Sequence, residues 1–362
     1  MMKKTMVKLK KPNIERVKQV LSVPFKAAHL AYRVLGPQFQ SVYHKHQDLR
    51  NTPSVFVHGN PHLDNFVRTF TGVGMVDFDR SRIGPYSWDI VRFLGSLQLY
   101  GHDNSPLSQE VIKCFVRGYK ASFRNPEIFY SIPSFLQEVQ PKIWQMKMSA
   151  YIEANKKWAK KLNMNAVDSS DSKWKKMLLA FLKSRKEHRL LNYYKLTEVG
   201  ISPGSLGKLH ILFLLEDVDE QIRGPILIDL KETYCEPNTS YFFTPTEHHG
   251  LRMIKAANLY APNVEQRLGY FTFEGIQYWG REIPSFNAKI KFRLSNSQQE
   301  ELGYMVGSQL GRGHRISLYH SDPKGVWLHL NQSIDSLIEF SEWMVQRSEE
   351  EVSYLKEQVV DK

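Results

Sequence analysis

The stretch between residues 54 and 79 constrains the fold most, because short apolar runs alternate there with polar residues that carry oxygen ligands. The β-prone run Val55–Val57 leads into the polar loop His58–Asn65, and a second apolar run begins at Phe66. After a turn with two glycines, Met75–Phe78 is predicted to be a third short strand that ends in carboxylates. The pattern predicts a small antiparallel sheet with five polar side chains at one end: Asn60, Asp64, Asn65, Asp77 and Asp79. Oxygen ligands on rigid strand ends are what Mg²⁺ and a triphosphate require.

The composition is that of a soluble globular protein. The length of 362 residues predicts about two domains at about 150 residues each, and 42% hydrophobic and 24% charged residues are ordinary values. Cys114 and Cys235 lie far apart and outside any metal-binding spacing, which indicates reduced thiols in a cytoplasmic protein. No apolar run approaches the roughly 20 residues of a membrane span. Residues 1–11 are basic without an apolar core, so we expect a disordered segment rather than a signal peptide.

The formal net charge of +12 restricts the class of partner. Such an excess fits nucleic acid, an anionic membrane surface or an anionic small substrate. The basic residues concentrate in 1–11 and 156–189, without the interleaved aromatic residues of single-strand-binding proteins. A solvated basic face is therefore favoured over nucleic-acid binding.

The composition changes near residue 196. Before this point helical patterns dominate, and we expect helices at 13–35 (interrupted by Pro24), 88–100, 108–123, 133–162 and 173–194. After it comes the glycine-rich segment 199–207, followed by strands at 209–215 and 225–233, the second of which carries Lys231. Further elements are predicted as a helix at 246–260, strands at 270–282, and helices at 297–315 and from Ser333 onward.

Three motifs together resemble a known group of enzymes. The loop His58–Asn65 resembles the H-G-D-x-H-x-x-N catalytic loop of aminoglycoside-phosphotransferase-like kinases, and Val76–Asp79 resembles their metal-binding motif. Gly84–Leu94 is similar to the helix start that follows in the same enzymes. A narrower resemblance, over roughly residues 20–350, is to the bacterial domain-of-unknown-function family 2252. Its marks are this loop, the D-F-D-x-x-x-x-G-P-x-x-W-D-x-x-R stretch from Asp77 to Arg92, a later glycine loop, and a Lys-Glu pair.

This resemblance implies an α+β, two-lobed, protein-kinase-like fold that is circularly permuted, because the glycine loop and lysine follow the catalytic loop. Such a permutation is physically allowed, since packing rather than chain order specifies a fold. It implies a large lobe at 12–195, a small nucleotide-binding lobe at 196–290, and C-terminal helices at 291–362 that pack on the large lobe. The helix at 297–315 must then end near the strand at 52–57, and Lys231 must face Asp77 across a cleft.

The resemblance also implies the cofactors ATP and Mg²⁺ and a role for each residue. Asn65 and Asp77 would hold Mg²⁺, with Asp79 as a second or supporting ligand. Lys231 would reach the phosphates, and backbone groups of the glycine loop would approach them: Gly200, Gly204, Ser205 and Gly207. Glu247 is a candidate partner for Lys231, and Glu232 competes with it. His58 and Asp89 are expected to orient the loop, Asp89 from the first turn of its helix.

Asn60 departs from the kinase pattern, which has an aspartate at this position to accept the substrate's hydroxyl proton. An amide cannot accept that proton. General-base help is worth about 10²–10⁴ in rate, whereas phosphoryl transfer depends chiefly on positioning and metal. Asn60 therefore indicates a slow or altered enzyme, in which Asp64 or His62 could substitute as the base, although neither has the spacing of the kinase pattern.

Four functional hypotheses remain open from the sequence. The first is an ATP- and Mg²⁺-dependent phosphotransferase with an unknown acceptor, and the second is a pseudokinase-like module that binds nucleotide or a protein partner. The third is a metal-dependent phosphohydrolase that uses His58, His62, Asp77 and Asp79, which leaves Lys231 unexplained. The fourth and weakest is nucleic-acid binding without catalysis.

Overall fold

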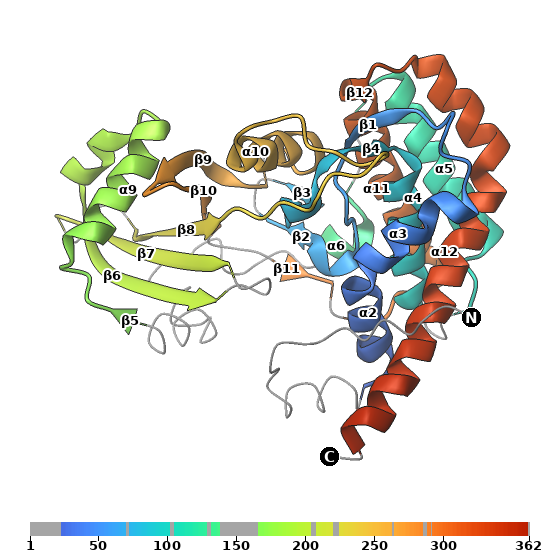
Figure 1. Cartoon of the computed structure of the whole chain (residues 1–362), viewed down its shortest axis with the longest axis horizontal. Helices are drawn as coiled ribbons and strands as arrows, with labels where there is room; N and C mark the ends of the chain where they lie inside the picture. Colours follow the sequence, from blue (N-terminus) through green and yellow to red (C-terminus); the bar gives the residue numbers. More distant parts are fainter. Residues whose placement is uncertain are drawn as a thin grey trace.

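The computed structural model describes residues 23–69, 72–101, 105–128, 132–137, 166–203, 208–219, 224–262, 264–284, 288–290 and 292–360. The expectations for residues 1–11, for most of the helix at 133–162, and for Gly204, Ser205 and Gly207 lie outside these ranges. A sheet with two flanking helices forms one lobe, and a larger, mainly helical lobe lies beside it (Figure 1). The mixed α+β class expected from the sequence is confirmed.

The small lobe is built on a sheet whose described strands all pair antiparallel with their neighbours. In spatial order its strands are β5 (Ala166–Val167), β6 (Tyr194–Pro203), β7 (Leu209–Asp217), β8 (Ile226–Glu232), β10 (Ile276–Glu282) and β9 (Gln266–Phe273). Helix α9 (Ser172–Ser184) begins at Asp171, whose carboxylate accepts the Lys173 N–H at 2.9 Å. A short 3-10 helix, η4 (His188–Asn192), leads from α9 into β6.

Helix α9 belongs to the small lobe, which corrects the lobe boundary predicted at residue 195. Its apolar side chains, among them Met177 and Phe181, join a core formed with Ile211, Phe213 and Phe271 of the sheet. The described chain is therefore already part of the small lobe at Ala166, where β5 pairs with β6. The resemblance had implied that this helix belongs to the large lobe, but its apolar stripe covers the small-lobe sheet.

The large lobe consists mainly of helices. In chain order these are α2 (Pro24–Val34), α3 (Gly36–His46), α4 (Ser87–Leu99), α5 (Gln109–Arg124), α6 (Ser134–Gln137), α11 (Asn296–Ile316) and α12 (Pro323–Val360). Pro24 begins α2 rather than interrupting a helix, as its fixed φ angle and missing N–H allow. Helix α12 packs on α4 and α2 and begins ten residues before the predicted start at Ser333.

Helices α5 and α11 approach each other closely. Side-chain hydroxyls cap both N-termini: Ser108 accepts the Val111 N–H, and Ser295 forms a capping box with Gln298. A Cβ atom at Gly307 of α11 would lie 2.3 Å from the Phe115 carbonyl oxygen of α5. Only glycine allows the two helix backbones to lie at this distance.

Two three-stranded sheets carry the polar loop, where the sequence had predicted one. Strand β1 (Ser54–Val57) pairs with β4 (Arg82–Pro85) and β12 (Leu318–Tyr319), and β2 (Phe66–Arg68) pairs with β3 (Val73–Met75) and β11 (Ala288–Lys289). The chain turns sharply at Gly59, so β1 and β2 diverge. The Phe56 N–H donates to the Ser317 carbonyl at 3.1 Å. This contact confirms that α11 ends beside β1.

Helix α10 (His249–Tyr260) connects the two lobes. It packs on β9 and β10 of the small lobe, and its residues Met253, Ala257 and Tyr260 enter the large-lobe core. None of the helices in the described ranges combines the length and apolar character needed to cross a membrane.

We predict that Gly307→Ala destabilises the protein by about 1–3 kcal/mol, the usual range for overpacking, because the new methyl group would clash with the α5 backbone. Gly325→Ala in α12 is the matched control, since the nearest atom to its added Cβ lies 3.7 Å away. Replacing a helical glycine by alanine without a clash stabilises by up to about 1 kcal/mol. Urea unfolding of both variants measures the difference, and equal effects would contradict the close α5–α11 contact.

Candidate active site

The corner His58–Gly59 is held by the buried carboxylate of Asp89. The His58 and Gly59 N–H groups donate to its two oxygens at 2.7 and 2.8 Å, and Trp88 Nε1 donates to the Gly59 carbonyl at 2.8 Å. Gly59 has a φ of +85°, and a Cβ there would lie 2.1 Å from the Arg80 carbonyl oxygen. His314 of α11 approaches the same carboxylate at 3.2 Å. The orienting role predicted for Asp89 is confirmed.

Asp77 has an unusual backbone conformation, with φ 73° and ψ 66° in the left-handed region. A non-glycine residue in this region is uncommon and is often found at functional sites. The Val76 N–H donates to the Asn65 carbonyl at 2.7 Å, so the polar loop and the Asp77 turn are tied together. The turn continues as the short 3-10 helix η2 (Phe78–Arg80), where the sequence had predicted a strand.

Arg252 of α10 fixes the far side of this turn, and the sequence analysis missed it. Its guanidinium donates to the carbonyls of Phe78 at 3.3 Å and Asp79 at 3.0 Å, and also to Ser81. Arg252 is buried, and burial lowers its pKa. The signal available in the sequence was an arginine directly before Met253, in a predicted helix that also carries Ala256 and Ala257.

The carboxyl groups of Asp77 and Asp79 interact closely. Burial and, next in size, the negative charge of Asp77 raise the pKa of Asp79 to about 7, although Lys231 and Arg252 oppose the shift. Two like charges in a partly desolvated site favour keeping a proton on one of them. A divalent cation bound between the two groups would relieve the same repulsion.

Lys231 of β8 extends toward this pair from the small lobe. Burial opposes its charge, but Asp229, and then Asp79 and Asp77, outweigh that effect and raise the Lys231 pKa. Lys231 is therefore within the electrostatic reach of Asp77 and Asp79, which belong to the other lobe. The ammonium also lies 5.9 Å from the ring centroid of Trp279, its cross-strand neighbour.

Lys231 lies beside Asp229, and neither of its predicted partners takes that place. Glu247 is exposed, and Glu232 pairs with Lys208 at 2.7 Å. Asp229 is buried beside His210 and lies 3.4 Å from Arg281 Nε. Burial raises the pKa of Asp229, but these neighbours and Lys231 outweigh it, so the pKa is lowered.

The charged residues share one face of the small-lobe sheet. His210 pairs with Lys231 and then Trp279 across the strands, and Leu212 pairs with Asp229 and then Arg281. Alternate residues of β8, such as Ile228 and Leu230, face the α9 core instead. Gly200, expected in a phosphate loop, lies within β6 opposite Leu212.

Asp64 is engaged in a cluster of its own. Its carboxylate accepts from Arg33 at 2.8 Å and Tyr100 at 2.5 Å, and His29 Nδ1 lies 3.3 Å away. Burial raises the Asp64 pKa, but the contacts with His29, Tyr100 and Arg33 outweigh it and lower the pKa. Asp64 is therefore a poor proton acceptor, which disfavours the role of base that the sequence analysis considered for it.

His29, His62 and Asp64 each offer a metal-ligand atom, all within 4.8 Å of one another. Arg33 already binds the Asp64 oxygen that faces His29. Burial lowers the pKa of His62, and the positive charges of Arg33 and Arg92 lower it further. This positive surrounding disfavours a cation, so we interpret the cluster as an ion-paired support of the loop.

Asn60 and Asn65 are both buried in the loop. Asn65 Nδ2 donates to the Asn60 carbonyl at 3.3 Å, and among the described residues no donor contacts Asn65 Oδ1. That oxygen remains free to bind a cation. Asn60 Oδ1 instead accepts a hydrogen bond from Arg92 at 2.7 Å.

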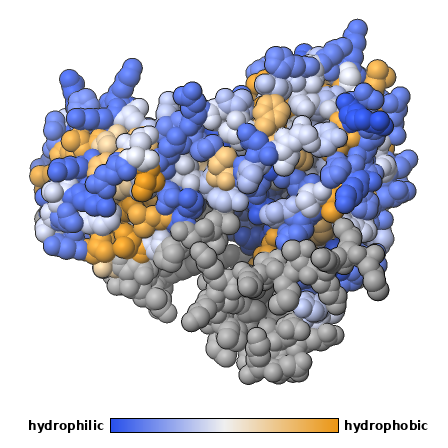
Figure 2. Space-filling view, in the orientation of Figure 1, coloured by the Kyte–Doolittle hydropathy of each residue, from blue (hydrophilic) through white to orange (hydrophobic). Residues whose placement is uncertain are grey.

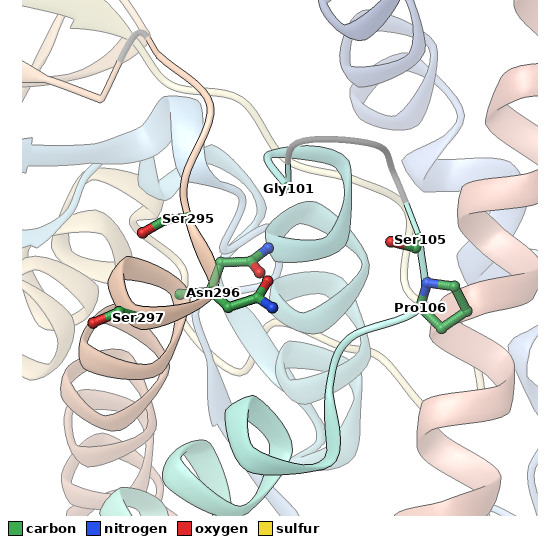
Figure 3. A pocket seen from close by; sticks show the side chains of 7 residues that line it. Gly101, Ser105, Pro106, Ser295, Asn296 and Ser297 are labelled. Carbon is green, nitrogen blue, oxygen red and sulfur yellow. The ribbon is translucent and has the colours of Figure 1, made fainter.

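A separate surface pocket of about 510 Å³ opens at the N-terminus of α11 (Figure 3). None of the lining residues in the described ranges has an ionisable side chain: Gly101, Ser105, Pro106, Ser295, Asn296, Ser297 and Gln299. Ser295 caps the helix, and Gln299 donates to the Leu97 carbonyl at 3.0 Å.

The fold and the site define a two-lobed α+β protein in which an acidic pair of one lobe faces a lysine of the other. The sequence model of the family described as "Uncharacterized protein conserved in bacteria (DUF2252)" matches residues 27–192 and 136–357. The chain belongs to this family. The comparisons with curated proteins and with solved structures return no match.

We predict that Asp89→Asn lowers the free energy of unfolding by about 1–3 kcal/mol, because the amide nitrogen would face a backbone N–H or His314 and leave a buried donor unpaired. Asp48→Asn is the matched control, since that carboxylate is exposed and contacts only nearby Arg50. Chemical denaturation measures both variants. A loss no larger than that of the control would show that Asp89 does not hold the loop.

Proposed function

We propose that this protein is an ATP- and Mg²⁺-dependent phosphotransferase with a circularly permuted protein-kinase-like fold. The observation that carries the proposal is the approach of Lys231 to Asp77 and Asp79 across the two lobes. Phosphoryl transfer needs a cation to bridge phosphate oxygens and a positive side chain to hold them. A carboxylate pair opposite a lysine supplies both requirements.

The residues fit a hard divalent cation. Asp77 and Asp79 contribute carboxylate oxygens, and Asn65 Oδ1 is an amide oxygen without a donor among the described residues. Mg²⁺ binds through one or two carboxylates together with substrate phosphates. The raised pKa of Asp79 supports this fit, because the pair holds excess negative charge that a cation would neutralise.

The residues also fit a phosphate group. Lys231 is a point charge of the kind that binds phosphates, and Asp229 and Trp279 beside it restrict its position. Lys289 adds a second ammonium near Asp64 and Asp77, and burial lowers its pKa. When bound, Mg²⁺ would polarise the phosphates, and this chain would orient them.

The chain order supports the permuted fold. In the resemblance, the loop and metal motif belong to the large lobe, and the lysine strand to the small lobe. The contact between Ser317 and β1 places the end of α11 where the large-lobe sheet begins. This is the arrangement expected of a circularly permuted chain, in which the large-lobe motifs precede the small lobe and the last helices return to the large lobe.

A pseudokinase-like nucleotide-binding module is the second candidate. The Asn60 amide cannot accept a proton, and the Asp64 carboxylate is already bound by Arg33 and Tyr100. The phosphohydrolase hypothesis has less support. His58 is buried, and its Nδ1 accepts the Asn60 N–H at 3.3 Å. His62 lies among positive charges rather than beside the carboxylate pair.

We expect Mg-ATP to stabilise the protein against thermal unfolding. A ligand at 100 times its Kd contributes about 2.7 kcal/mol, which differential scanning fluorimetry detects readily. Asp77→Ala and Lys231→Ala should remove the shift. Lys208→Ala, which removes a partly exposed lysine on the same sheet, should retain it. A folded protein whose Tm responds to no Mg²⁺- or Mn²⁺-nucleotide would contradict the proposal.

We also expect Mg²⁺ binding to release a proton near neutral pH. Asp79 has a raised pKa of about 7, so below that value the carboxyl is mostly protonated and must lose its proton to bind the cation. Apparent affinity should therefore fall as the pH drops from 7 to 5 and level off above 8. Calorimetry in two buffers of different ionisation enthalpy counts the protons. Asp79→Asn should abolish the release, and release that persists in this variant would assign the proton to another group.

A further inference from the structure

Arg92 carries a buried positive charge without a carboxylate partner. It lies in α4 with 0% exposure, and in the described part of the chain no acidic side chain reaches ion-pair distance from it. Its guanidinium donates to the Tyr32 carbonyl at 3.1 Å and to Asn60 Oδ1 at 2.7 Å, and it stacks over the Tyr32 ring at 4.0 Å. Burial lowers the Arg92 pKa to about 10, so the group remains charged at neutral pH. Buried arginines are usually paired with an acid.

The contact with Arg92 fixes the orientation of the Asn60 amide. Arginine is only a donor, so the amide oxygen must face it and the amide nitrogen must point away. Nothing in the described ranges accepts a hydrogen bond from Asn60 Nδ2. The position that holds a proton acceptor in kinase-like enzymes therefore presents an N–H donor, with a positive charge directly behind it.

Other basic side chains lie near Asn60. His62, two residues further along, is buried, and neither of its ring nitrogens has a partner among the described residues. Arg33 and Arg80 lie close enough to lower the Arg92 pKa by repulsion, although each is paired, with Asp64 and Glu236 respectively. Arg92 is thus the one of these three guanidiniums without an acid.

We infer that the acceptor substrate carries an oxyanion, a carboxylate or a phosphate, which accepts a hydrogen bond from Asn60 Nδ2 in the field of Arg92. The inference rests on the proposed phosphotransferase function and names the class of its second substrate. A ligand oxyanion would supply the negative charge that Arg92 lacks. It also explains why this site can do without a general base.

The transfer is balanced without proton removal. An oxygen of the ionised acceptor forms a bond to the γ-phosphorus of ATP, and the bond between that phosphorus and the bridging oxygen breaks. The bridging oxygen leaves with the electron pair as ADP, and the product is an acyl phosphate or a phosphoanhydride. A neutral hydroxyl acceptor would instead need a base for its proton.

The first test concerns the uncompensated charge. Asn60→Asp is nearly isosteric and gives Arg92 a carboxylate, so we expect Tm to rise by about 2 °C or more. Asn331→Asp is the matched control, because Asn331 Oδ1 accepts from Lys120 on the exposed surface, where solvent screens the new pair. A Tm of Asn60→Asp at or below that of the wild type would overturn the inference.

The second test concerns the oxyanion itself. The full-length protein is loaded with Mg²⁺ and a non-hydrolysable ATP analogue, which fills the γ-phosphate position, and is titrated with sodium phosphate, sodium acetate or glycerol. Sodium chloride at equal ionic strength is the reference. We expect phosphate or acetate to bind and glycerol not to bind, and the anion that binds identifies the source. In Asn60→Asp the affinity should fall at least about tenfold because a carboxylate repels the anion, whereas Asn331→Asp should match the wild type.

Binding of neither anion, or equal binding by Asn60→Asp, would overturn the inference. These two results can be distinguished from failure of the proposed phosphotransferase function, because nucleotide binding is measured separately. If no Mg²⁺-nucleotide binds, the phosphotransferase is wrong. Oxyanion binding to the protein alone that is lost in Asn60→Asp would still support the anion site.

Discussion

The buried carboxylate of Asp89 is the interaction on which the rest of the site depends. It binds two successive backbone N–H groups at the His58–Gly59 corner and contacts His314 of α11. A desolvated carboxylate is tolerated only where donors satisfy it, and here those donors come from elements far apart in the chain. Once this corner is fixed, Asn60 and Asn65 follow within a few residues, and the hydrogen bond from Val76 to Asn65 sets the start of the Asp77 turn. The geometry of the acidic pair is therefore a consequence of Asp89.

The small lobe contributes its charges from one face of a single sheet, because successive residues of a strand point to opposite faces. Residues of β8 that face α9 are apolar, whereas Asp229 and Lys231 lie on the opposite face. That face carries the charged side chains of Asp229 and Lys231. A small apolar cluster lies beside these charged residues and consists of Leu212, Leu214, Leu227 and Ile283. In the view of Figure 2, hydrophobic residues gather on the small-lobe surface at the left, and hydrophilic residues cover most of the large lobe. Arg252 then ties the two lobes at the backbone of the turn that follows Asp77.

Sequence patterns predicted the features that depend on local chemistry. The boundaries of α4, α5 and α11 follow from apolar periodicity and from the caps at Ser108 and Ser295. Strand pairing was predicted incorrectly for β1, because its partner β12 lies more than 260 residues away and only tertiary packing selects it. The lobe assignment of α9 failed for the same reason. Asp229 and Arg252 were missed since each becomes informative only when its distant partners are known. The motif order, by contrast, predicted that Lys231 faces Asp77 from the other lobe.

Asn60 has a different meaning in the sequence and in the structure. Read alone, the amide is a catalytic aspartate that has lost its charge. In the structure the amide oxygen is bonded to Arg92, a fully buried cation. An aspartate at position 60 would neutralise that cation, and its carboxylate would be occupied by the guanidinium rather than free to accept a proton. Asn60 and Arg92 therefore act as a unit: together they leave one positive charge at the loop. A buried charge of this kind costs free energy in the empty protein, and under the proposed function the group that lowers this cost is an anion that arrives with the substrate.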